Sequence, residues 1–580
     1  MVNFTIDDRR VQAKEGTTIL EVAKKYGIKI PTLCYLKDIN EIAACRVCLV
    51  EIKGKENLVA ACNTEVKEGI EVYTHTKRVL FARKMNVQFI LANHDYRCAT
   101  CVRNRNCTLQ QLAYDLAVDR TPFEEKYEKF DWDSDYPLIR NASKCIKCMR
   151  CVQVCEKVQG LGVWDIVNTG RRTSVNVSGM RKIQEADCAL CGQCVTHCPV
   201  GALSVRNDVR KVTEAIMDED KIVIFQIAPA VRAAWGETLG LSPEQATEKR
   251  LVAAVKAMGA DYVFDTNFTA DLTIMEESSE LLERLSHPED YKWPMYTSCC
   301  PGWVRFLKSQ YPEQVGQLST AKSPQQMFGA VAKSYYAQLL GVDPSRIFCV
   351  SIMPCMAKKH EAAIEVMNDA GTGQDVDIVV TTREVDDMIR SNQLNPALLA
   401  ERDFDVPLGV GSGAGVIFGA TGGVMEAALR SAHYLVSGVN PDPDAFKMVR
   451  GIDGIKEAEV NIAGVNIKAA VVNGLGNTRK LIERIRSGKA EYHFVEVMAC
   501  PGGCVGGGGQ PIHDGQECAA PRGAKLYDLD KKNPIRFSHE NPSIQEIYAD
   551  FLDKPLSHKS HKLLHTDHEA WDMPSAKDMD

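Results

Sequence analysis

The feature that most constrains this sequence is a cysteine motif that occurs twice. Cys145-x2-Cys148-x2-Cys151-x3-Cys155 is repeated as Cys188-x2-Cys191-x2-Cys194-x3-Cys198. This spacing is typical of a pair of 4Fe-4S clusters, in which the fourth cysteine of each motif ligates the other cluster. We therefore expect one cluster on Cys145, Cys148, Cys151 and Cys198, and a second on Cys155, Cys188, Cys191 and Cys194. Neither leaves an open coordination site, so the pair is expected to carry electrons.

Composition supports metal ligation as the role of the cysteines. The 580-residue chain has 22 cysteines, gathered in tight groups, whereas disulfide scaffolds are short secreted chains. A chain of this length exceeds one hydrophobic core, so three or more domains are expected. The net charge is -7, and the dispersed Lys and Arg indicate neither nucleic-acid nor membrane binding. Without a leader-like start or a long apolar span, the protein is expected to be cytoplasmic.

The first 125 residues contain two further groups of possible ligands. Residues 1–79 alternate short β-like runs with a helical stretch at 18–23, and Cys34, Cys45, Cys48 and Cys62 suit a 2Fe-2S cluster. Residues 80–125 carry His94-x3-Cys98-x2-Cys101-x5-Cys107, which fits either a 4Fe-4S cluster or a zinc site. Zinc is also the alternative for the first group. The acidic stretch 120–138 is expected to be an exposed connection, and the repeated motif lies in a region that we place at 126–209.

Residues 210–520 show a different pattern. Strand-like runs alternate with helical stretches, which predicts an α/β domain of parallel sheets with helices on both faces. Three such runs, at 294–296, 347–352 and 493–497, are followed by cysteines. Ligand sites lie outside the carboxyl ends of parallel strands, so Cys300, Cys355, Cys500 and Cys504 are expected to converge, as a cubane cluster requires. Ordinary core cysteines are the alternative.

Two glycine-rich segments and the tail complete the chain. Residues 409–423 and 502–509 let the backbone approach another group closely. Neither contains a GxGxxG motif that opens a helix, so no dinucleotide site is expected.

The tail 521–580 is polar with a helical segment, and its histidines are expected to lie in solvent.

Three segments carry a resemblance to a known family. Residues 297–303 (TSCCPGW), 353–359 (MPCMAKK) and 496–504 (EVMACPGGC) resemble the signatures of the iron-only (FeFe) hydrogenases. The Cys45-x2-Cys48 loop and the His94 motif resemble those of hydrogenases and of the iron-sulfur subunits of NADH-linked oxidoreductases. The resemblance implies an H-cluster, whose cubane is bound by the four convergent thiols and bridged by Cys504 to a diiron subsite with CO, cyanide and a dithiolate. It also implies one 2Fe-2S and three accessory 4Fe-4S clusters.

The fold that this resemblance implies has several modules. They are a β-grasp 2Fe-2S ferredoxin-like domain, a small 4Fe-4S domain with one His and three Cys ligands, and a two-4Fe-4S ferredoxin-like domain. A two-lobed α/β catalytic domain and the C-terminal tail follow.

The resemblance also assigns residues around the diiron subsite. Lys358 is expected to pair with a cyanide ligand. The pocket is expected to be lined by Ala228, Pro229, Ala230, Gln325, Met353, Phe418 and Met498. Many relatives have Ser at the position of Ala230, which predicts one hydrogen bond to cyanide fewer in this chain.

A proton path is implied by the residues that remain. Cys299, Cys349 and Cys518 are not needed as ligands; Cys349 lies in a strand run, Cys518 has no evident role, and Cys299 matches the proton-transfer cysteine of the family. Glu277, Glu280 and Arg284 share one face of a helical stretch. Such a row is often a solvated set of ion pairs. The resemblance implies instead a relay in which Ser319 lies between the two carboxylates.

The expected function is the reversible reduction of protons to dihydrogen. Electrons would come from ferredoxin or from a flavin- and NAD(P)-binding partner subunit, and maturation proteins would supply the diiron subsite. The alternatives are a non-catalytic electron-transfer subunit and a cluster-assembly or hydrogen-sensing relative. The joint presence of Cys299, Lys358, Glu277, Glu280 and Ser319 favours the enzyme.

Overall fold

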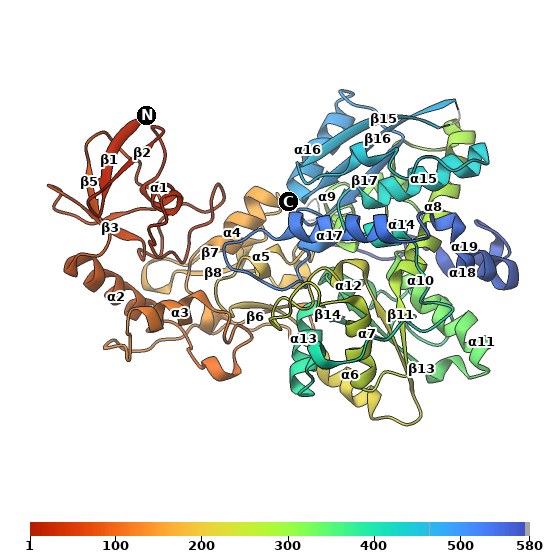
Figure 1. The fold of residues 1–580 in the computed structure, drawn as a ribbon, viewed down its shortest axis with the longest axis horizontal. Coiled ribbons are helices and arrows are strands. Elements are labelled where there is room, and N and C mark those ends of the chain that lie inside the picture. The colour runs from red at the N-terminus through yellow and green to blue at the C-terminus, as the bar shows by residue number, and fades with distance from the viewer. Residues whose placement is uncertain (463, 575–580) are drawn as a thin grey trace. The chain divides into compact units, whose positions relative to one another are not determined.

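The computed structural model describes residues 1–462 and 464–574 of the chain, which forms two compact units (Figure 1). The first unit comprises residues 1–183, 193–204 and 513–516. The second comprises 184–192, 205–512 and the chain from 517 onward. The repeated cysteine motif is therefore shared between the units, because 184–192 is grouped with the second.

The first unit begins with a five-stranded sheet in the order β2-β1-β5-β3-β4. Its strands are β1 (Val2–Ile6), β2 (Arg9–Ala13), β3 (Leu49–Ile52), β4 (Val59–Ala60) and β5 (Glu71–Tyr73). Helix α1 (Ile19–Lys25) starts with a capping box between Thr18 and Glu21 and buries Ile19, Leu20, Val22 and Ala23. The expected helical stretch at 18–23 is confirmed, and these side chains join the core beneath the sheet.

The rest of the first unit has short elements joined by loops. Its helices are α2 (Lys77–Leu91), α3 (Thr108–Asp115), α4 (Arg150–Gln153) and α5 (Gln193–Thr196), and its strands pair as β6 (Leu138–Arg140) with β9 (Leu203–Val205) and β7 (Trp164–Val167) with β8 (Ser174–Val177). The buried Arg83 of α2 donates two hydrogen bonds to the Leu49 carbonyl of β3, which holds α2 to the sheet. No helix or strand is assigned between α3 and β6, in agreement with the predicted connection.

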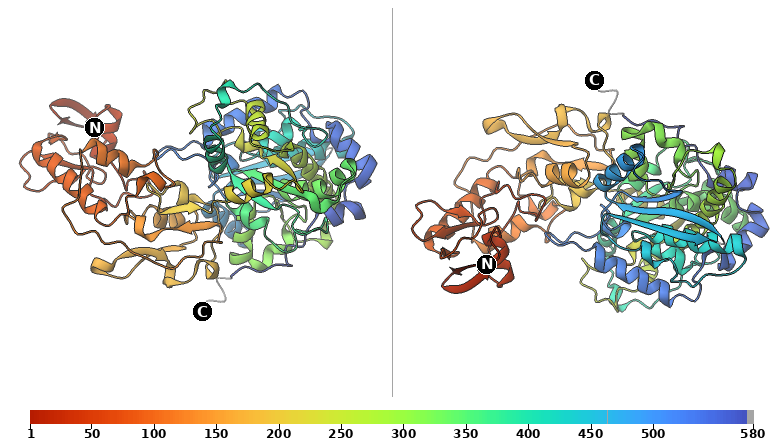
Figure 2. Two further views of the ribbon diagram at one scale, coloured as in Figure 1. Left: turned by 90° about the horizontal axis from the view of Figure 1, so that it is seen from below. Right: turned by 90° about the horizontal axis from the view of Figure 1, so that it is seen from above.

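The second unit contains two four-stranded sheets, one in each lobe. The first has the order β11-β10-β13-β14 and is parallel throughout, with β10 (Ile222–Ile227), β11 (Tyr262–Asp265), β13 (Ile347–Met353) and β14 (Ile378–Thr381). The second has the order β12-β17-β16-β15, with β12 (Met295–Tyr296), β15 (Ile455–Ile462), β16 (Val465–Asn473) and β17 (Phe494–Met498). Only β15 runs antiparallel to its neighbour, β16. The long strands of this second sheet lie side by side in Figure 2.

Helices cover both sheets. They are α6 (Val209–Ile216), α7 (Glu248–Ala257), α8 (Thr266–Ser286), α9 (Pro301–Gln310), α10 (Pro324–Val331), α11 (Ala337–Leu340), α12 (Ala357–Glu361), α13 (Thr382–Ser391), α14 (Gly413–Ile417), α15 (Gly423–Ser437), α16 (Leu475–Arg486), α17 (Ala519–Lys532), α18 (Pro542–Ile547) and α19 (His558–Leu564). Strands β13 and β17 are apolar and almost wholly buried, as expected of parallel strands covered on both faces. The two-lobed α/β fold is confirmed.

The C-terminal tail is a packed part of the second unit. Helix α17 packs against α14, and α19 packs against α10. The expectation that the tail histidines lie in solvent is wrong for His539 and His565, which are 7% and 5% exposed. Leu563 and Leu564 of α19 are buried, and His565 follows them directly in the chain and is buried beside them.

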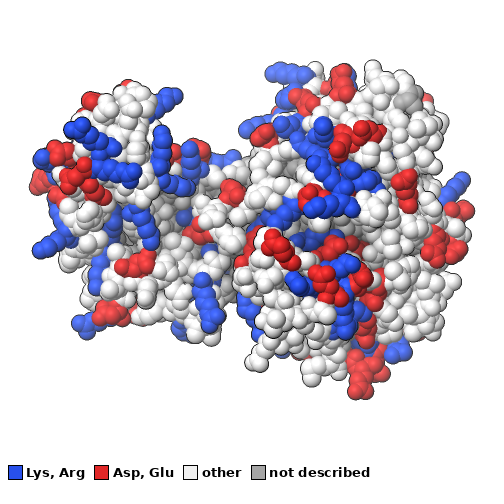
Figure 3. Space-filling model, in the orientation of Figure 1, with Lys and Arg blue, Asp and Glu red and all other residues white. Residues whose placement is uncertain are grey.

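One face of the molecule shows how its charged side chains are distributed. Acidic and basic side chains are interspersed on the face drawn in Figure 3. None of the helices in the described part of the chain is both long and apolar enough to span a bilayer.

Candidate active site and iron-sulfur sites

The loops that follow β12, β13 and β17 meet in the second unit. The Ala499 N–H, after β17, donates a hydrogen bond to the Cys300 sulfur, after β12, at 3.4 Å. The Gly509 N–H donates to the Pro354 carbonyl, after β13, at 2.8 Å. Cysteine-bearing loops from both lobes thus lie together at the carboxyl ends of their strands.

The four thiols of these loops share one buried environment. Burial raises the pKa of Cys300, Cys355, Cys500 and Cys504, and for the last three the charges of neighbouring thiols raise it further. Each thiol is therefore disfavoured as a thiolate unless a cation binds beside it. In the described part of the chain, only the exposed His287, Glu289 and Asp290 bring three ligand atoms within 4.8 Å of one another. A mononuclear zinc site holds its sulfurs roughly 3.8 Å apart, so the four thiols are not gathered at zinc spacing.

Glycines allow the loops to approach so closely. Gly502 and Gly503 have φ values of 77° and 88°, which side chains rarely tolerate. A Cβ on Gly503 would lie 2.7 Å from the Thr421 nitrogen, and one on Gly507 would lie 2.3 Å from the Pro354 oxygen. The glycine-rich segment 502–509 therefore lets the backbone pack against the loops that carry the other thiols.

The expected pocket residues come from five parts of the second unit. Ala228, Pro229 and Ala230 follow β10, Gln325 lies in the first turn of α10, Phe418 follows α14, and Met353 and Met498 end β13 and β17. All of these residues are buried. Phe418, Met498 and Cys299 belong to one apolar cluster, against which Cys300 and Cys504 pack. The Gln325 Oε1 atom has no hydrogen-bond partner among the described residues, which fits a bound group beside it.

Lys358 is a buried cation next to the same loops. Its ammonium donates to the Cys299 carbonyl at 3.2 Å and to Glu361 Oε2 at 2.8 Å. Burial acts to lower its pKa, but Glu361 outweighs this and the pKa is raised. Glu361 also accepts hydrogen bonds from the Ser323 hydroxyl and the Gln325 amide. Lys358 is thus held charged within an apolar site.

The expected relay residues form a buried row. Glu277, Glu280 and Arg284 lie on one face of α8 and are 0%, 7% and 4% exposed, so the solvated-row alternative is excluded. Arg284 donates to Glu280 at 2.5 Å, and the Ser319 hydroxyl donates to Glu280 Oε2 at 2.7 Å. The Ser319 N–H is held at the end of β12 by the Tyr296 carbonyl, at 2.7 Å.

At the inner end of this row, the surroundings of Glu277 and Cys299 favour the protonated form of both groups. Burial, and then the charges of Glu280 and Glu496, raise the pKa of Glu277 to about 8. The Ser319 hydroxyl and the Ser298 backbone act in the opposite direction on this pKa without reversing the increase. Burial, and then Glu277, raise the pKa of Cys299 well above its ordinary value. Near neutral pH, both groups therefore hold their protons.

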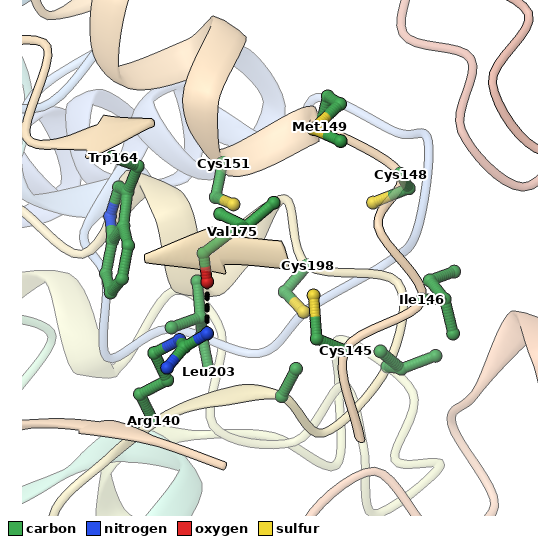
Figure 4. A pocket seen from close by; sticks show the side chains of 12 residues that line it. Arg140, Cys145, Ile146, Cys148, Met149, Cys151, Trp164, Val175, Cys198 and Leu203 are labelled. Carbon is green, nitrogen blue, oxygen red and sulfur yellow. Dashed lines mark hydrogen bonds between the residues drawn. The ribbon is translucent and has the colours of Figure 1, made fainter. Parts of the chain in front are cut away.

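The first ferredoxin-like site is a pocket in the first unit. Cys145, Cys148, Cys151 and Cys198, the set expected for one cluster, all line it, and Figure 4 shows their sulfurs around a common space. The Arg140 guanidinium also lines the pocket and donates to the Val175 carbonyl. Ligands from both copies of the motif therefore meet here, as the fourth-cysteine exchange predicts.

The second ferredoxin-like set is divided between the units. Cys155 and Cys194 belong to the first unit, whereas Cys188 and Cys191 belong to the second. Within the second unit, the Cys500 thiol donates to the Cys191 carbonyl at 3.5 Å. Arg305 donates twice to the Cys188 carbonyl, at 3.0 and 2.9 Å. The ligand loop of an accessory site thus touches a thiol of the candidate active site.

The remaining two ligand sets lie in the first unit. The thiols of Cys34 and Cys45 are in contact, and so are those of Cys48 and Cys62. Within each contact, one thiol shifts the pKa of the other. The buried His94 is hydrogen-bonded through Nδ1 to the Lys144 carbonyl at 2.8 Å. Burial lowers its pKa, so the ring is neutral and Nε2 remains available as a ligand, the usual arrangement for metal-binding histidines. Cys98, Cys101 and Cys107 follow it in the same unit.

Known proteins match the chain over almost its whole length. Residues 221–508 match the family described as iron only hydrogenase large subunit, C-terminal domain. The chain is 45% identical over 577 residues to the NADP-reducing hydrogenase subunit HndD of Solidesulfovibrio fructosivorans, covering 98% of each chain. It is 38% identical over 574 residues to iron hydrogenase 1 of Clostridium pasteurianum, covering 97% of this chain and 99% of that one.

The chain belongs to the iron-only (FeFe) hydrogenases. A solved structure, that of an apo variant of the FeFe-hydrogenase HydA1 from Chlamydomonas reinhardtii, agrees with a TM-score of 0.57 at 43% identity and covers 64% of this chain and 100% of that one. Other segments of this hydrogenase match a 2Fe-2S binding domain at 1–77, the NADH-ubiquinone oxidoreductase-G iron-sulfur region at 83–122 and a 4Fe-4S dicluster domain at 144–202. The hydrogenase is thus an oxidoreductase with an H-cluster and accessory 2Fe-2S and 4Fe-4S clusters.

Sequence reasoning missed three parts of this hydrogenase. Residues 516–571 match the family described as iron hydrogenase small subunit, although the tail gave no motif. Glu361, the partner of Lys358, was a detectable signal, because it lies three residues further along the same helix. Glu496 lies on β17, before the loop that carries Cys500. Its carboxylate accepts hydrogen bonds from the Gly422 and Met425 N–H groups, both at 2.7 Å. Only the fold brings it to the start of α15.

Proposed function

We propose that this hydrogenase binds the cubane of its H-cluster through Cys300, Cys355, Cys500 and Cys504. We also propose that protons reach the site through Glu280, Ser319, Glu277 and Cys299. When bound, the diiron subsite supplies the chemistry that interconverts protons, electrons and dihydrogen. The observation that carries the proposal is the row of buried acids that ends at Cys299, next to a thiol of the cubane set.

Each residue of the relay has a defined part. Arg284 fixes the outer carboxylate of Glu280, whose other oxygen accepts the Ser319 hydroxyl proton. Glu277 has a pKa of about 8 and can both release and accept a proton near neutral pH. The Cys299 thiol keeps its proton in the resting state and offers it on the active-site side.

The pocket residues hold the diiron subsite in an apolar setting. Lys358 is positioned to neutralise an anionic ligand such as cyanide, because its charge is maintained by Glu361. The side chains of Ala228, Pro229, Ala230, Gln325, Met353, Phe418 and Met498 enclose the site and exclude water. Ala230 has no hydroxyl, so the subsite is held by one hydrogen bond fewer than with serine there.

Electrons are proposed to pass through four accessory clusters. The 2Fe-2S cluster is assigned to Cys34, Cys45, Cys48 and Cys62, and three 4Fe-4S clusters to the remaining sets (His94, Cys98, Cys101, Cys107; Cys145, Cys148, Cys151, Cys198; Cys155, Cys188, Cys191, Cys194). The contact of the Cys500 thiol with the Cys191 carbonyl supports the last set as the one that feeds the H-cluster.

The test of the relay replaces Cys299 by serine. Cys299→Ser is expected to lower hydrogen evolution roughly a hundredfold or more, because a serine hydroxyl is a much weaker acid than a thiol. Iron content and the CO and cyanide infrared bands of anaerobically matured protein should be unchanged. Cys518→Ser, at the half-buried start of α17, is the matched control and should keep full activity. Full activity in Cys299→Ser would refute the relay, and absent CO and cyanide bands in the parent would refute the assigned H-cluster.

A partner subunit is proposed as the electron acceptor. The relative with 45% identity is named a subunit of an NADP-reducing hydrogenase, which supports a flavin- and NAD(P)-binding partner over ferredoxin alone. Purified chain is expected to reduce viologen dyes with dihydrogen but not NADP, and a co-purified partner should restore NADP reduction. NADP reduction by the isolated chain, or efficient turnover with ferredoxin only, would contradict this choice. Maturation proteins are required for the diiron subsite in either case.

A further inference from the structure

The proposed relay stops short of solvent. Its outermost members, Glu280 and Arg284, are 7% and 4% exposed. An arginine guanidinium keeps its proton throughout the accessible pH range, so Arg284 positions Glu280 but cannot deliver protons to it. Protons must therefore enter from another group or cavity beside Glu280.

A cavity of about 550 Å³ lies on the far side of the Ser319-Thr320 backbone. Its lining comes from the loop that leads into α10, including Leu318 and Thr320, and from the C-terminal segment 561–570. His561 and Lys562 line it and are themselves exposed, so the cavity is open to solvent. It contains three histidines: His561, His565 and His568.

Ser319 and Thr320 form the wall between this cavity and Glu280. On the relay side, the Thr320 N–H donates to both Glu280 oxygens at 3.2 and 3.1 Å. On the cavity side, His568 Nε2 bonds to the Ser319 carbonyl at 3.0 Å, and His565 Nδ1 bonds to the Thr320 hydroxyl at 2.8 Å. The two histidines and Glu280 thus contact the same two residues from opposite sides.

His565 is built to exchange a proton. Its Nδ1 bonds to the Thr320 hydroxyl, and its Nε2 lies 3.1 Å from Glu276 Oε2. Glu276 is fully buried and also accepts the Tyr548 hydroxyl and the Leu556 N–H, at 2.6 and 2.8 Å. An imidazole can take a proton at one nitrogen and release one from the other, and Glu276 stabilises the cation formed in between.

Other charged groups surround the cavity histidines. His561 stacks on His565 at 4.2 Å, and burial lowers the pKa of both His561 and His568. The remaining ionisable groups near these three rings are Glu280, Glu283, Lys308, Asp369, Lys562, Asp567 and Glu569. Five of these groups are carboxylates and two are lysines, and a further lysine, Lys322, pairs with Asp369.

We propose that this cavity is the proton entrance of the hydrogenase and that His565 passes protons through the Thr320 hydroxyl to Glu280. The inference rests on the proposed relay. His565 lines the cavity and takes a proton from its water, and it gives one from Nδ1 to the Thr320 oxygen. The Thr320 hydroxyl releases its own proton to a water that hands it to Glu280, because the direct contact of Thr320 with Glu280 is made by the backbone N–H. No electron moves, and each group returns to its starting state when the next proton arrives.

The experiment measures hydrogen evolution against pH with excess reduced viologen. His565→Ala is expected to lower the rate about tenfold or more and to steepen its fall as pH rises, because fewer protons reach Glu280. Added imidazole should restore the rate, since it can occupy the vacated space and carry protons. His558→Ala is the matched control, because His558 lies on the same helix, is exposed and does not line the cavity. Thr320→Val, which keeps the backbone N–H but removes the hydroxyl, should show the same defect without imidazole rescue.

Parallel measurements separate the possible outcomes. The CO and cyanide infrared bands and the melting temperature report whether each variant is folded and loaded. Unchanged rates and pH profiles in His565→Ala and Thr320→Val, with Glu280→Gln inactive, would place the entrance elsewhere and overturn this proposal alone. A loss in His565→Ala that imidazole does not restore would assign the residue a structural role and also overturn it. Full activity in Glu280→Gln would instead remove the relay on which both proposals depend.

Discussion

A carboxyl group taken out of water is costly inside a protein, and Glu277 is such a group. It is fully buried, and the charges of Glu280 and Glu496 add to the effect of burial on its pKa. A buried carboxyl with a pKa raised this far is suited to proton transfer, which is the role proposed for Glu277. The same reasoning applies to His565, which was expected in solvent and is buried against Glu276.

Glu277→Gln tests the cost of that carboxyl. Its pKa is raised from the ordinary 4.5 to about 8. Stability is therefore greatest below about pH 4.5 and is lost as pH rises toward 8, because the unfolded chain releases this proton more readily. At pH 7 the substitution is expected to stabilise the protein by roughly 3 kcal/mol while it abolishes hydrogen evolution.

Chemical unfolding between pH 5 and 8 measures this effect. The gain in Glu277→Gln should grow with pH, and Glu313→Gln, an exposed carboxylate with a distant ion pair, should change little. An equal gain at all pH values would show that ionisation of Glu277 is not the cause.

At the scale of elements, the active site depends on how closely the cysteine-bearing loops pack against one another. Cys500 and Cys504 are separated by Pro501, Gly502 and Gly503, and both glycines have positive φ. The segment then runs against Pro354, next to Cys355 of the other lobe. The strands fix where each loop begins, and the glycines decide how near the sulfurs come.

Gly503→Ala is expected to prevent formation of the H-cluster cubane. The new Cβ would lie 2.7 Å from the Thr421 nitrogen at a φ of 88°, so the loop must shift and its thiols with it. We expect a destabilisation of roughly 1–3 kcal/mol and a loss of about six irons per matured chain, four of the cubane and two of the diiron subsite, with the accessory clusters kept. Gly341→Ala, also at positive φ but with open space around it, is the control and should keep its full iron content. Normal iron content in Gly503→Ala would contradict the role given to this loop.

At the scale of the whole molecule, the two units are not separate stretches of sequence. Residues 513–516, from the C-terminal part of the chain, belong to the first unit. There Asp514 forms an ion pair with Arg150, which is 2% exposed and also donates to the Tyr35 carbonyl at 3.1 Å. Asp514 further accepts the Thr108 hydroxyl. One short segment thus contacts residues of two predicted modules in the first unit, and Arg150 links it to Tyr35 of a third.

Asp514→Ala is expected to destabilise the first unit selectively. It leaves the buried Arg150 guanidinium without its anion, which costs roughly 3 kcal/mol. Thermal unfolding followed through the visible absorption of the clusters should begin several degrees lower, while the CO and cyanide bands stay unchanged. Asp453→Ala, which removes an exposed pair with Lys456, should have almost no effect. Equal melting of both variants would show that the Arg150 pair is not needed to hold this segment.

The sequence by itself determined the cluster chemistry and the fold class. Cluster ligands are close in sequence because one loop must wrap one cluster, so motifs such as Cys145-x2-Cys148-x2-Cys151 can be interpreted without a structure. The buried strands β10, β13 and β17 were also predictable, because parallel strands covered on both faces are mostly apolar, although these strands also carry Gln226, Ser351 and Glu496.

Only the tertiary structure decided which polar groups are buried and what they meet. Glu277, Glu280 and Arg284 have the spacing of a solvated row, and packing of α8 inside the second unit turns them into a buried chain. The pairing of Glu276 with His565 joins residues 289 positions apart. Burial and such long-range contacts depend on how distant segments pack, and no local pattern of residues encodes them.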